Sequence, residues 1–310
     1  MTRPRATAFH GVFAANICTL KVDFTVDAPA LTRHVTALTA TRGIAGLLTN
    51  GHAGENFALG RTEKRRVLEV VRAAIGPDPL IIAGVNSESS LDAARQAADA
   101  EKAGANAILV FPPFSWALSR GRETVLAHHR AVLDAVELPI MLYAAPVGSG
   151  AMVYEPELLA DLIRLPRVVG IKEGSWETAR YEANRRLIRA LKPDVAVMAS
   201  GDEHLFTCFV VGTEGSQVSI ACLVPDTVVA LYEAVQQGNL AAARAAHETI
   251  YPLAKAIYGT PPGAHATARI KPCLKLLGRL DSDRVRPPIG PLDRAEQDRL
   301  RSVLREAKLL

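Results

Sequence analysis

Eight short apolar runs alternate with longer segments of helical periodicity along the first 221 residues, and this pattern restricts the fold more than any other feature. Such alternation is typical of βα units, because parallel strands need a crossover connection that is usually a helix. The predicted strands are Gly11 to Cys18, Gly43 to Thr49, Leu80 to Val85, Ala105 to Phe111, Pro139 to Ala144, Val168 to Lys172, Val195 to Ser200 and Gly215 to Ala221. The predicted helices between them include Thr62 to Ile75, Ser90 to Ala103, Arg122 to Val136, Glu155 to Leu162 and Trp176 to Leu191.

Eight parallel strands form either a closed barrel or an open doubly wound sheet, and glycine motifs distinguish the two. No predicted strand is followed by G-x-G-x-x-G or by the Gly-Lys-Ser/Thr of a phosphate-binding loop, so nucleotide binding on an open sheet loses its main support. We therefore predict an α/β protein with a catalytic (β/α)8 TIM barrel over residues 1–238, closed by a helix over Asp226 to Gln237. Residues 239–310 are expected to form a C-terminal helical extension, with helices over Leu240 to Tyr258, Ala264 to Leu277 and Leu292 to Lys308.

The composition argues against several classes of protein. Of the 310 residues, 49% are hydrophobic and 22% charged, which is ordinary for a globular chain. The formal net charge of +4 is spread without a polybasic block, which argues against a nucleic-acid partner, and no apolar run reaches membrane-spanning length. The four cysteines and eight histidines show neither disulfide nor metal spacing, so we expect a cytoplasmic protein without a metal.

Lys172 ends the apolar run Val168 to Ile171, and in a barrel the active site is built from the carboxyl ends of the strands. Burial lowers the pKa of a lysine toward the neutral, nucleophilic form, so this position suits covalent catalysis. The alternative is a structural ion pair with Glu173 or Glu203. The other lysines considered are expected to be solvated on helix faces or loops, namely Lys64, Lys102 and Lys192.

Tyr143 ends the fifth predicted strand. A phenol at this place can transfer a proton or hydrogen-bond a substrate oxyanion. It can equally fill the barrel with a hydroxyl that has found a partner within the protein. Its role therefore depends on whether it lies next to Lys172.

The second strand is followed by the glycine-rich turn Asn50 to Glu55. Glycines allow backbone N–H groups to approach a ligand closely, which suits a carboxylate, although a tight βα turn explains the same residues. Within it, His52 supplies a group that titrates near neutral pH in an unperturbed setting. Glu55 is expected to orient the loop, and the pair His128 and His129 to lie at the surface or at an interface.

The motifs together resemble the dihydrodipicolinate synthase and N-acetylneuraminate lyase family of class I aldolases over nearly the whole chain. They are Asn50-Gly51-His52-Ala53-Gly54-Glu55, Tyr143-Ala144-Ala145-Pro146, Gly170-Ile171-Lys172-Glu173, Ser200-Gly201-Asp202-Glu203 and Gly212-x-x-Gly215. The resemblance implies that Lys172 forms an imine with a 2-oxo acid, that Tyr143 is the acid/base phenol, and that His52 belongs to the catalytic set. It implies substrate contacts from Gly51, Ala53, Phe114, Gly201 and Gln217, no cofactor, and a homo-oligomer, either a dimer or the homotetramer usual in the family.

Five positions depart from the family pattern. His52 and Ala53 replace the two hydroxyl residues of the turn, and Phe114 replaces a phenol donated across the dimer. Gly148 stands where the synthases have an arginine for a second carboxylate, a charge-assisted contact worth roughly 1.5 to 3 kcal/mol. Gln217 stands where an aliphatic residue usually lines the pocket. These departures argue against dihydrodipicolinate synthase activity proper.

We therefore expect a Schiff-base-forming lyase, an aldolase or a dehydratase, that acts on pyruvate or a 2-oxo(-3-deoxy) acid. The substrate stays open, because His52, Phe114, Trp116 and Gln217 are compatible with sugar-acid and with aryl-substituted 2-oxo acids alike. Three alternatives also remain open: dihydrodipicolinate synthase proper, of lysine biosynthesis; a non-catalytic barrel that binds 2-oxo acids; and a metal-dependent class II aldolase, which needs converging His and carboxylate ligands.

Overall fold

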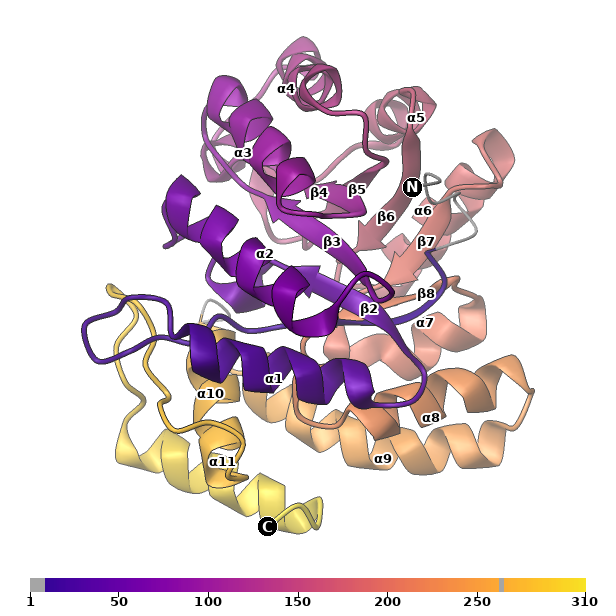
Figure 1. The fold of residues 1–310 in the computed structure, drawn as a ribbon. Helices are drawn as coiled ribbons and strands as arrows, with labels where there is room; N and C mark the ends of the chain where they lie inside the picture. The colour runs from indigo at the N-terminus through magenta and orange to yellow at the C-terminus, as the bar shows by residue number, and fades with distance from the viewer. Residues whose placement is uncertain (1–8, 262–264) are drawn as a thin grey trace.

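The computed structural model describes residues 9–261 and 265–310, and it contains a closed parallel barrel. Each strand pairs with the next along the chain, and β8 pairs with β1 to close the ring. The predicted TIM barrel with a C-terminal helical extension is confirmed (Figure 1). The strands are β1 Gly11–Ala15, β2 Ile44–Thr49, β3 Leu80–Val85, β4 Ala107–Val110, β5 Ile140–Ala144, β6 Val168–Glu173, β7 Ala196–Ala199 and β8 Gly215–Val218.

Helices surround the barrel and form the C-terminal extension, and those around the barrel bury an apolar face against the strands. They are α1 Ala28–Ala40, α2 Arg61–Ile75, α3 Ser90–Lys102, α4 Arg122–Ala135, α5 Pro156–Arg164, α6 Thr178–Leu191, α7 Leu205–Val211, α8 Pro225–Gln236, α9 Leu240–Ile257, α10 Ala266–Leu276 and α11 Arg294–Glu306. The last three lie together on the side of α1 and α8 (Figure 1), where α9 packs along α8. The start predicted for the tenth helix, Ala264, lies outside the described residues.

Several helices begin at a side chain that caps the first turn. Ser89, Asn239 and Asp293 each accept a hydrogen bond from the backbone N–H three residues later, which satisfies one of the donors left unpaired at a helix start. Ser89 directly precedes the helix that the sequence predicts from Ser90 to Ala103. Asp27 caps α1 in the same way, and this helix was not among those predicted.

The register of β5 and β6 determines the geometry of the site. Tyr143 on β5 is the direct partner of Lys172 on β6, and Lys172 is in turn paired with Met198 on β7. Paired residues on neighbouring parallel strands lie side by side at the same height in the barrel. The phenol and the amine are therefore neighbours at the carboxyl ends of two adjacent strands.

The structure corrects three expectations about burial. Lys64 is not solvated: it is 5% exposed and donates to the backbone oxygen of Asn86 (2.9 Å) and to Oε1 of Gln96 (3.1 Å). His128 and His129 are not surface residues, because both are buried on the inner face of α4. The apolar residues of a helix determine which of its faces meets the barrel, and polar residues on that face are buried with them.

The predicted last strand was too long. β8 ends at Val218, and the next residues form a short 3-10 helix, Ile220–Cys222.

None of the helices in residues 9–261 and 265–310 combines the length and apolar character needed to cross a lipid bilayer.

Candidate active site

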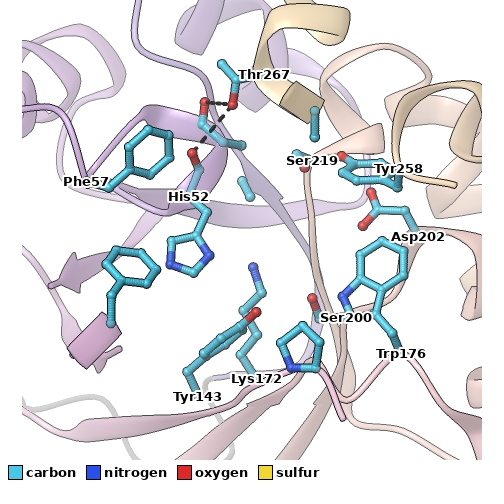
Figure 2. A pocket seen from close by; sticks show the side chains of 15 residues that line it. His52, Phe57, Tyr143, Lys172, Trp176, Ser200, Asp202, Ser219, Tyr258 and Thr267 are labelled. Carbon is cyan, nitrogen blue, oxygen red and sulfur yellow. Dashed lines mark hydrogen bonds between the residues drawn. The ribbon is translucent and has the colours of Figure 1, made fainter. Parts of the chain in front are cut away.

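A cavity of about 660 Å³ opens at the carboxyl ends of the strands, with Lys172 at its floor (Figure 2). Its walls combine residues from the barrel strands, from the loops after them and from the C-terminal extension. The lining residues are Ala15, His52, Ala53, Phe57, Phe114, Tyr143, Pro146, Lys172, Trp176, Ser200, Asp202, Ser219, Tyr258, Ala266 and Thr267.

Lys172 is buried without a counter-ion in contact. Its side chain is 9% exposed, and its Nζ makes no hydrogen bond or ion pair of standard length with a described residue. Burial lowers its pKa from 10.5 to about 8, against the opposing effect of the Asp202 charge. The alternative ion pair with Glu173 is wrong, because this carboxylate instead accepts from Asn184 Nδ2 (2.8 Å) and Ser175 Oγ (2.9 Å). A lysine in this state is close to the neutral form that attacks a carbonyl.

Tyr143 lies against the lysine. The Lys172 Nζ is 5.8 Å from the centre of the phenol ring, which also packs against Phe111. A Cβ at Gly174 would come within 2.9 Å of the ring and 3.2 Å of the hydroxyl, so the glycine makes room for the phenol. The hydroxyl has no hydrogen-bond partner among the described residues, which disfavours a purely structural phenol. Burial raises its pKa, so it is protonated at neutral pH and able to donate.

His52 faces the same space from the turn after β2. Its ring is 5.5 Å from that of Tyr143 and 4.4 Å from that of Phe111. Burial, and then the charge of Lys172, lowers its pKa to about 3, so the expectation that it titrates near neutral pH is wrong. Its Nε2 is buried and has no partner among the described residues, which leaves a neutral imidazole available to a ligand.

The turn that carries His52 is held from the C-terminal extension. Thr267 of α10 donates to the backbone oxygen of Ala53 (3.2 Å), and Lys271, one turn later, forms an ion pair with Glu55. Both charged side chains are 1% exposed. Glu55 thus orients the loop as expected, although its partner, a fully buried lysine, was not foreseen.

Asp202 forms the opposite wall. Its carboxylate is 3% exposed and accepts from the backbone N–H of Ile220 (2.7 Å). Burial raises its pKa to about 6, while this backbone hydrogen bond, the nearby Lys172 charge and a hydrogen bond from Tyr258 act in the other direction. The Tyr258 hydroxyl also forms a hydrogen bond with Ser219 Oγ.

The structure brings together five of the eight residues chosen from the sequence: His52, Ala53, Phe114, Tyr143 and Lys172 all line the cavity. Gly51 and Gly201 lie in the backbone just beside it, next to His52 and Asp202. Gln217 is not at the cavity, contrary to expectation. It is fully buried inside the barrel, where its Nε2 contacts the sulfur atoms of Met141 (3.3 Å) and Met198 (3.2 Å).

Sequence reasoning missed the residues that lie far along the chain from the motifs. Asp202 lies within the motif Ser200-Gly201-Asp202-Glu203, so a search for carboxylates at the ends of predicted strands would have found it. Tyr258 and Thr267 gave no signal, because they come from helices whose position over the barrel is set by packing. Trp116, considered as a possible contact, packs instead against the ring of His128 (5.3 Å) outside the cavity lining.

Comparison with known protein families matches residues 8–307 to the Dihydrodipicolinate synthetase family. The chain belongs to this family. The match covers the barrel and the extension alike, and it supports the resemblance drawn from the strand-end motifs. Membership identifies the protein as a lyase of the dihydrodipicolinate synthetase family.

Relatives within the family carry different names. The 4-hydroxy-tetrahydrodipicolinate synthase of Parasynechococcus marenigrum is 32% identical over 98% of this chain and 97% of its own. The dihydrodipicolinate synthase structure from Agrobacterium tumefaciens has a TM-score of 0.88 at 27% identity, covering 97% and 99% of the two chains. YagE of Escherichia coli K12, provisionally named a 2-dehydro-3-deoxy-D-gluconate aldolase, is 25% identical over 99% of both chains.

YagE has also been solved in complex with pyruvate, and that structure has a TM-score of 0.89 at 24% identity, covering 97% of this chain and 99% of YagE. At this identity the likeness establishes the shared fold.

Within residues 9–261 and 265–310, no cluster of three or more His, Cys, Asp or Glu side chains is arranged to hold a metal ion.

Proposed function

We propose that the protein is a class I lyase that forms a Schiff base between Lys172 and pyruvate or another 2-oxo acid, without a cofactor. The observation that carries the proposal is the buried Lys172 Nζ, unpaired at the cavity floor beside the Tyr143 phenol. A pKa of about 8 keeps a useful fraction of this amine neutral at physiological pH. A cytoplasmic homo-oligomer, a dimer or tetramer, is part of the same proposal and rests on the resemblance.

Lys172, Tyr143 and the turn that carries His52 have different roles in the proposed reaction. The Lys172 amine attacks the 2-oxo carbon, water leaves, and the protonated imine withdraws electrons from the neighbouring carbon so that it can lose a proton or a carbon substituent. The neutral Tyr143 phenol donates a proton to the substrate oxygen that leaves as water or becomes a hydroxyl. It then recovers a proton from the substrate. The substrate carboxylate is held by the turn, where His52 and Ala53 open a 3-10 helix whose first N–H groups have no intrahelical partner.

Dihydrodipicolinate synthase proper is the less favoured activity. No arginine is among the cavity-lining residues, and Gly148, where the synthases place theirs, has no atom within 4 Å of an added Cβ. A second substrate with its own carboxylate would therefore lack a bidentate partner. We propose aldol cleavage, aldol addition or dehydration of a 2-oxo acid in its place.

Trapping of the imine tests the proposed function. The protein is incubated with pyruvate and sodium borohydride, digested, and its peptides are weighed. We expect the reduced adduct on the peptide that contains Lys172. Lys64, whose pKa burial also lowers to about 8, is an internal control and should stay unmodified, since it lies outside the cavity. No adduct, or an adduct on Lys64 alone, would overturn the proposal.

The pH dependence of imine formation gives a second test. Because only the neutral amine reacts, the rate with pyruvate should rise about tenfold per pH unit below pH 8 and level off above it. The Asp202 charge raises the pKa of Lys172, so Asp202→Asn should move the midpoint to lower pH. Glu203→Gln, the same change at the adjacent residue outside the cavity, should leave the midpoint in place. A midpoint that Asp202→Asn does not lower would contradict the assignment.

A further inference from the structure

We propose that Arg269 of the C-terminal extension is a positioning residue for the reacting amine: it holds the end of α9 where the Tyr258 hydroxyl hydrogen-bonds Asp202. Through this contact the extension sets the charge on the cavity wall that faces Lys172, and with it the pH at which the amine reacts. The inference rests on the proposed function, in which Lys172 forms the imine, and adds a residue outside the cavity that controls it.

Arg269 is a fully buried arginine on α10 that binds backbone oxygens as well as a counter-ion. Its Nε donates to Glu296 of α11 (2.9 Å). Its two terminal nitrogen atoms donate to the backbone oxygens of Ile257 (2.9 Å), Thr260 (2.7 Å) and Pro261 (3.3 Å). A guanidinium presents its donors in a rigid plane, so these hydrogen bonds fix the end of α9 and the loop after it relative to α10.

The end of α9 needs such partners, because the last carbonyl groups of a helix have none within the helix. α9 ends at Ile257, and Tyr258 is its C-cap residue. Arg269 pairs with the carbonyl of Ile257, and Arg299 of α11 pairs with that of Ala256 (3.0 Å). A cation at this place also suits the negative end of the helix dipole. The extension thus fixes the backbone directly beside Tyr258.

The same end of α9 packs closely on the 3-10 helix Asp202–His204, which follows β7. A Cβ at Gly259 would lie 2.6 Å from Oε1 of Glu203, so a larger residue at this position would require a shift of one segment or the other. The placement of Tyr258 against Asp202 therefore depends on backbone contacts of the helix end as well as on the two side chains.

The Tyr258 hydroxyl joins two groups of the cavity wall. It forms hydrogen bonds with Ser219 Oγ and with the Asp202 carboxylate, and it lies between these two side chains in Figure 2. The backbone N–H of Ile220, next to Ser219, donates to the same carboxylate (2.7 Å). Hydrogen bonds donated to a carboxylate favour its ionised form. Both donors therefore help the buried Asp202 to keep its negative charge.

The charge of Asp202 acts on Lys172 within the cavity. It raises the pKa of the amine, against the larger effect of burial. Without the hydrogen bond from Tyr258, the pKa of Asp202 rises above its present value of about 6, and the carboxyl is protonated over more of the neutral range. The pKa of Lys172 then falls. Loss of the Arg269 contacts should therefore move the midpoint of imine formation to lower pH.

The pH profile of imine formation with pyruvate tests the inference in the full-length protein. Arg269→Lys keeps a cation but lacks the planar fork that reaches several oxygens. We expect its midpoint to lie at least about 0.5 pH unit below that of the wild-type protein. Unfolding of part of the protein lowers the amplitude but leaves the midpoint in place, so a merely structural role does not produce the shift. An unchanged midpoint would overturn the inference.

A second variant covers the case in which Arg269→Lys does not fold. In Arg269→Met/Glu296→Met neither charge of this buried pair remains, and such replacements are often close to neutral for stability. The α9 end loses the same hydrogen bonds, so we expect the same downward shift. A folded double variant with the wild-type midpoint would equally contradict the role of Arg269.

Arg72→Lys is the matched control. Arg72 of α2 also donates to backbone oxygens, those of Gly104 (2.9 Å) and Pro79 (3.0 Å), but neither it nor these partners line the cavity. Its replacement should lower stability and leave the midpoint in place. A shift as large as in Arg269→Lys would show that the midpoint reports general loosening of the protein, and the inference would fail.

A double variant tests whether Arg269 acts through Tyr258. Tyr258→Phe should lower the midpoint at least as much as Arg269→Lys does. Arg269→Lys/Tyr258→Phe should lower it no further than Tyr258→Phe alone, because one contact carries both effects. Additive shifts would show that Arg269 reaches the amine by another route, which is contrary to the inference.

Trace labelling with acetic anhydride separates this inference from the proposed function. Labelled over a range of pH and measured by peptide mass, it reports the neutral fraction of the Lys172 amine without pyruvate, and Lys64 serves as the reference whose midpoint should not move. A lowered labelling midpoint in Arg269→Lys, with no imine in the wild-type protein, would remove the proposed function and leave the positioning role. Imine formation with no shift by either measurement would do the reverse.

Discussion

Lys172→Met is expected to lower turnover of a 2-oxo acid by about 10⁴-fold or more, as removal of a covalent nucleophile does elsewhere, while raising stability. A pKa lowered from 10.5 to about 8 means that the native state disfavours the protonated amine by about 3 kcal/mol at pH 7. This penalty is complete below pH 8 and fades as the pH rises toward 10.5. Methionine fills the same space without the charge, so urea denaturation at pH 7 should show a gain on the order of 1 to 3 kcal/mol.

Lys64→Met is the matched control for this result. Lys64 is also buried with its pKa lowered to about 8, but it donates to Asn86 and Gln96. Removing it relieves the same burial penalty but also loses these two hydrogen bonds, so the gain in stability should be about 1 to 3 kcal/mol smaller than in Lys172→Met, while turnover by the folded protein persists. The opposite pattern, a destabilised Lys172→Met that keeps more than a tenth of the activity, would show that Lys172 has a structural role.

The contrast between these two lysines shows why sequence alone located the reacting group but not its surroundings. Lys172 and Tyr143 end apolar runs whose length identifies them as barrel strands, and the parallel register then places the two side chains together. Strand ends have a fixed position in this fold, so residue order is enough. Lys64 lies on a helix, where the side of the helix that meets the barrel depends on packing, and the sequence therefore suggested a solvated residue.

The walls of the cavity were less predictable for the same reason. Trp176 follows β6 in a loop, and Tyr258 and Thr267 come from the extension, so their approach to Lys172 depends on contacts between distant segments. Gln217 shows the converse error. It does lie on a strand, but on a layer below the cavity, against two methionine sulfur atoms. Alternation along a strand indicates which side chains point inward, not which of the inner layers meets the substrate.

The extension contributes to the site by holding the turn that carries His52. Thr267 donates to the carbonyl groups of the turn. The buried ion pair between Lys271 and Glu55 connects α10 to the last residue of the turn. Glu55 also accepts from the backbone N–H of Arg286 (2.7 Å). Three segments of the chain thus converge on one carboxylate, and the geometry of the proposed carboxylate-binding turn depends on that convergence.

Lys271→Met is therefore expected to lower the free energy of unfolding by about 3 to 5 kcal/mol, because it leaves the Glu55 carboxylate buried without its counter-ion. Urea denaturation measures this loss, and KM for pyruvate should rise in the folded fraction as the turn loosens. Lys275→Met, one helical turn further along α10, removes an exposed ion pair with Asp283 (3.1 Å) and should change stability by less than about 1 kcal/mol.

A double variant distinguishes the ion pair from the packing of the lysine stem. In Lys271→Met/Glu55→Gln neither charge of this buried pair remains, so the loss should be clearly smaller than in Lys271→Met alone, since the amide still accepts from Arg286 N. If the double variant is as unstable as Lys271→Met or less stable, the uncompensated charge is not the cause. The double variant could also recover stability without recovering KM. The charge pair would then both support the fold and set the geometry of the turn that binds the substrate carboxylate.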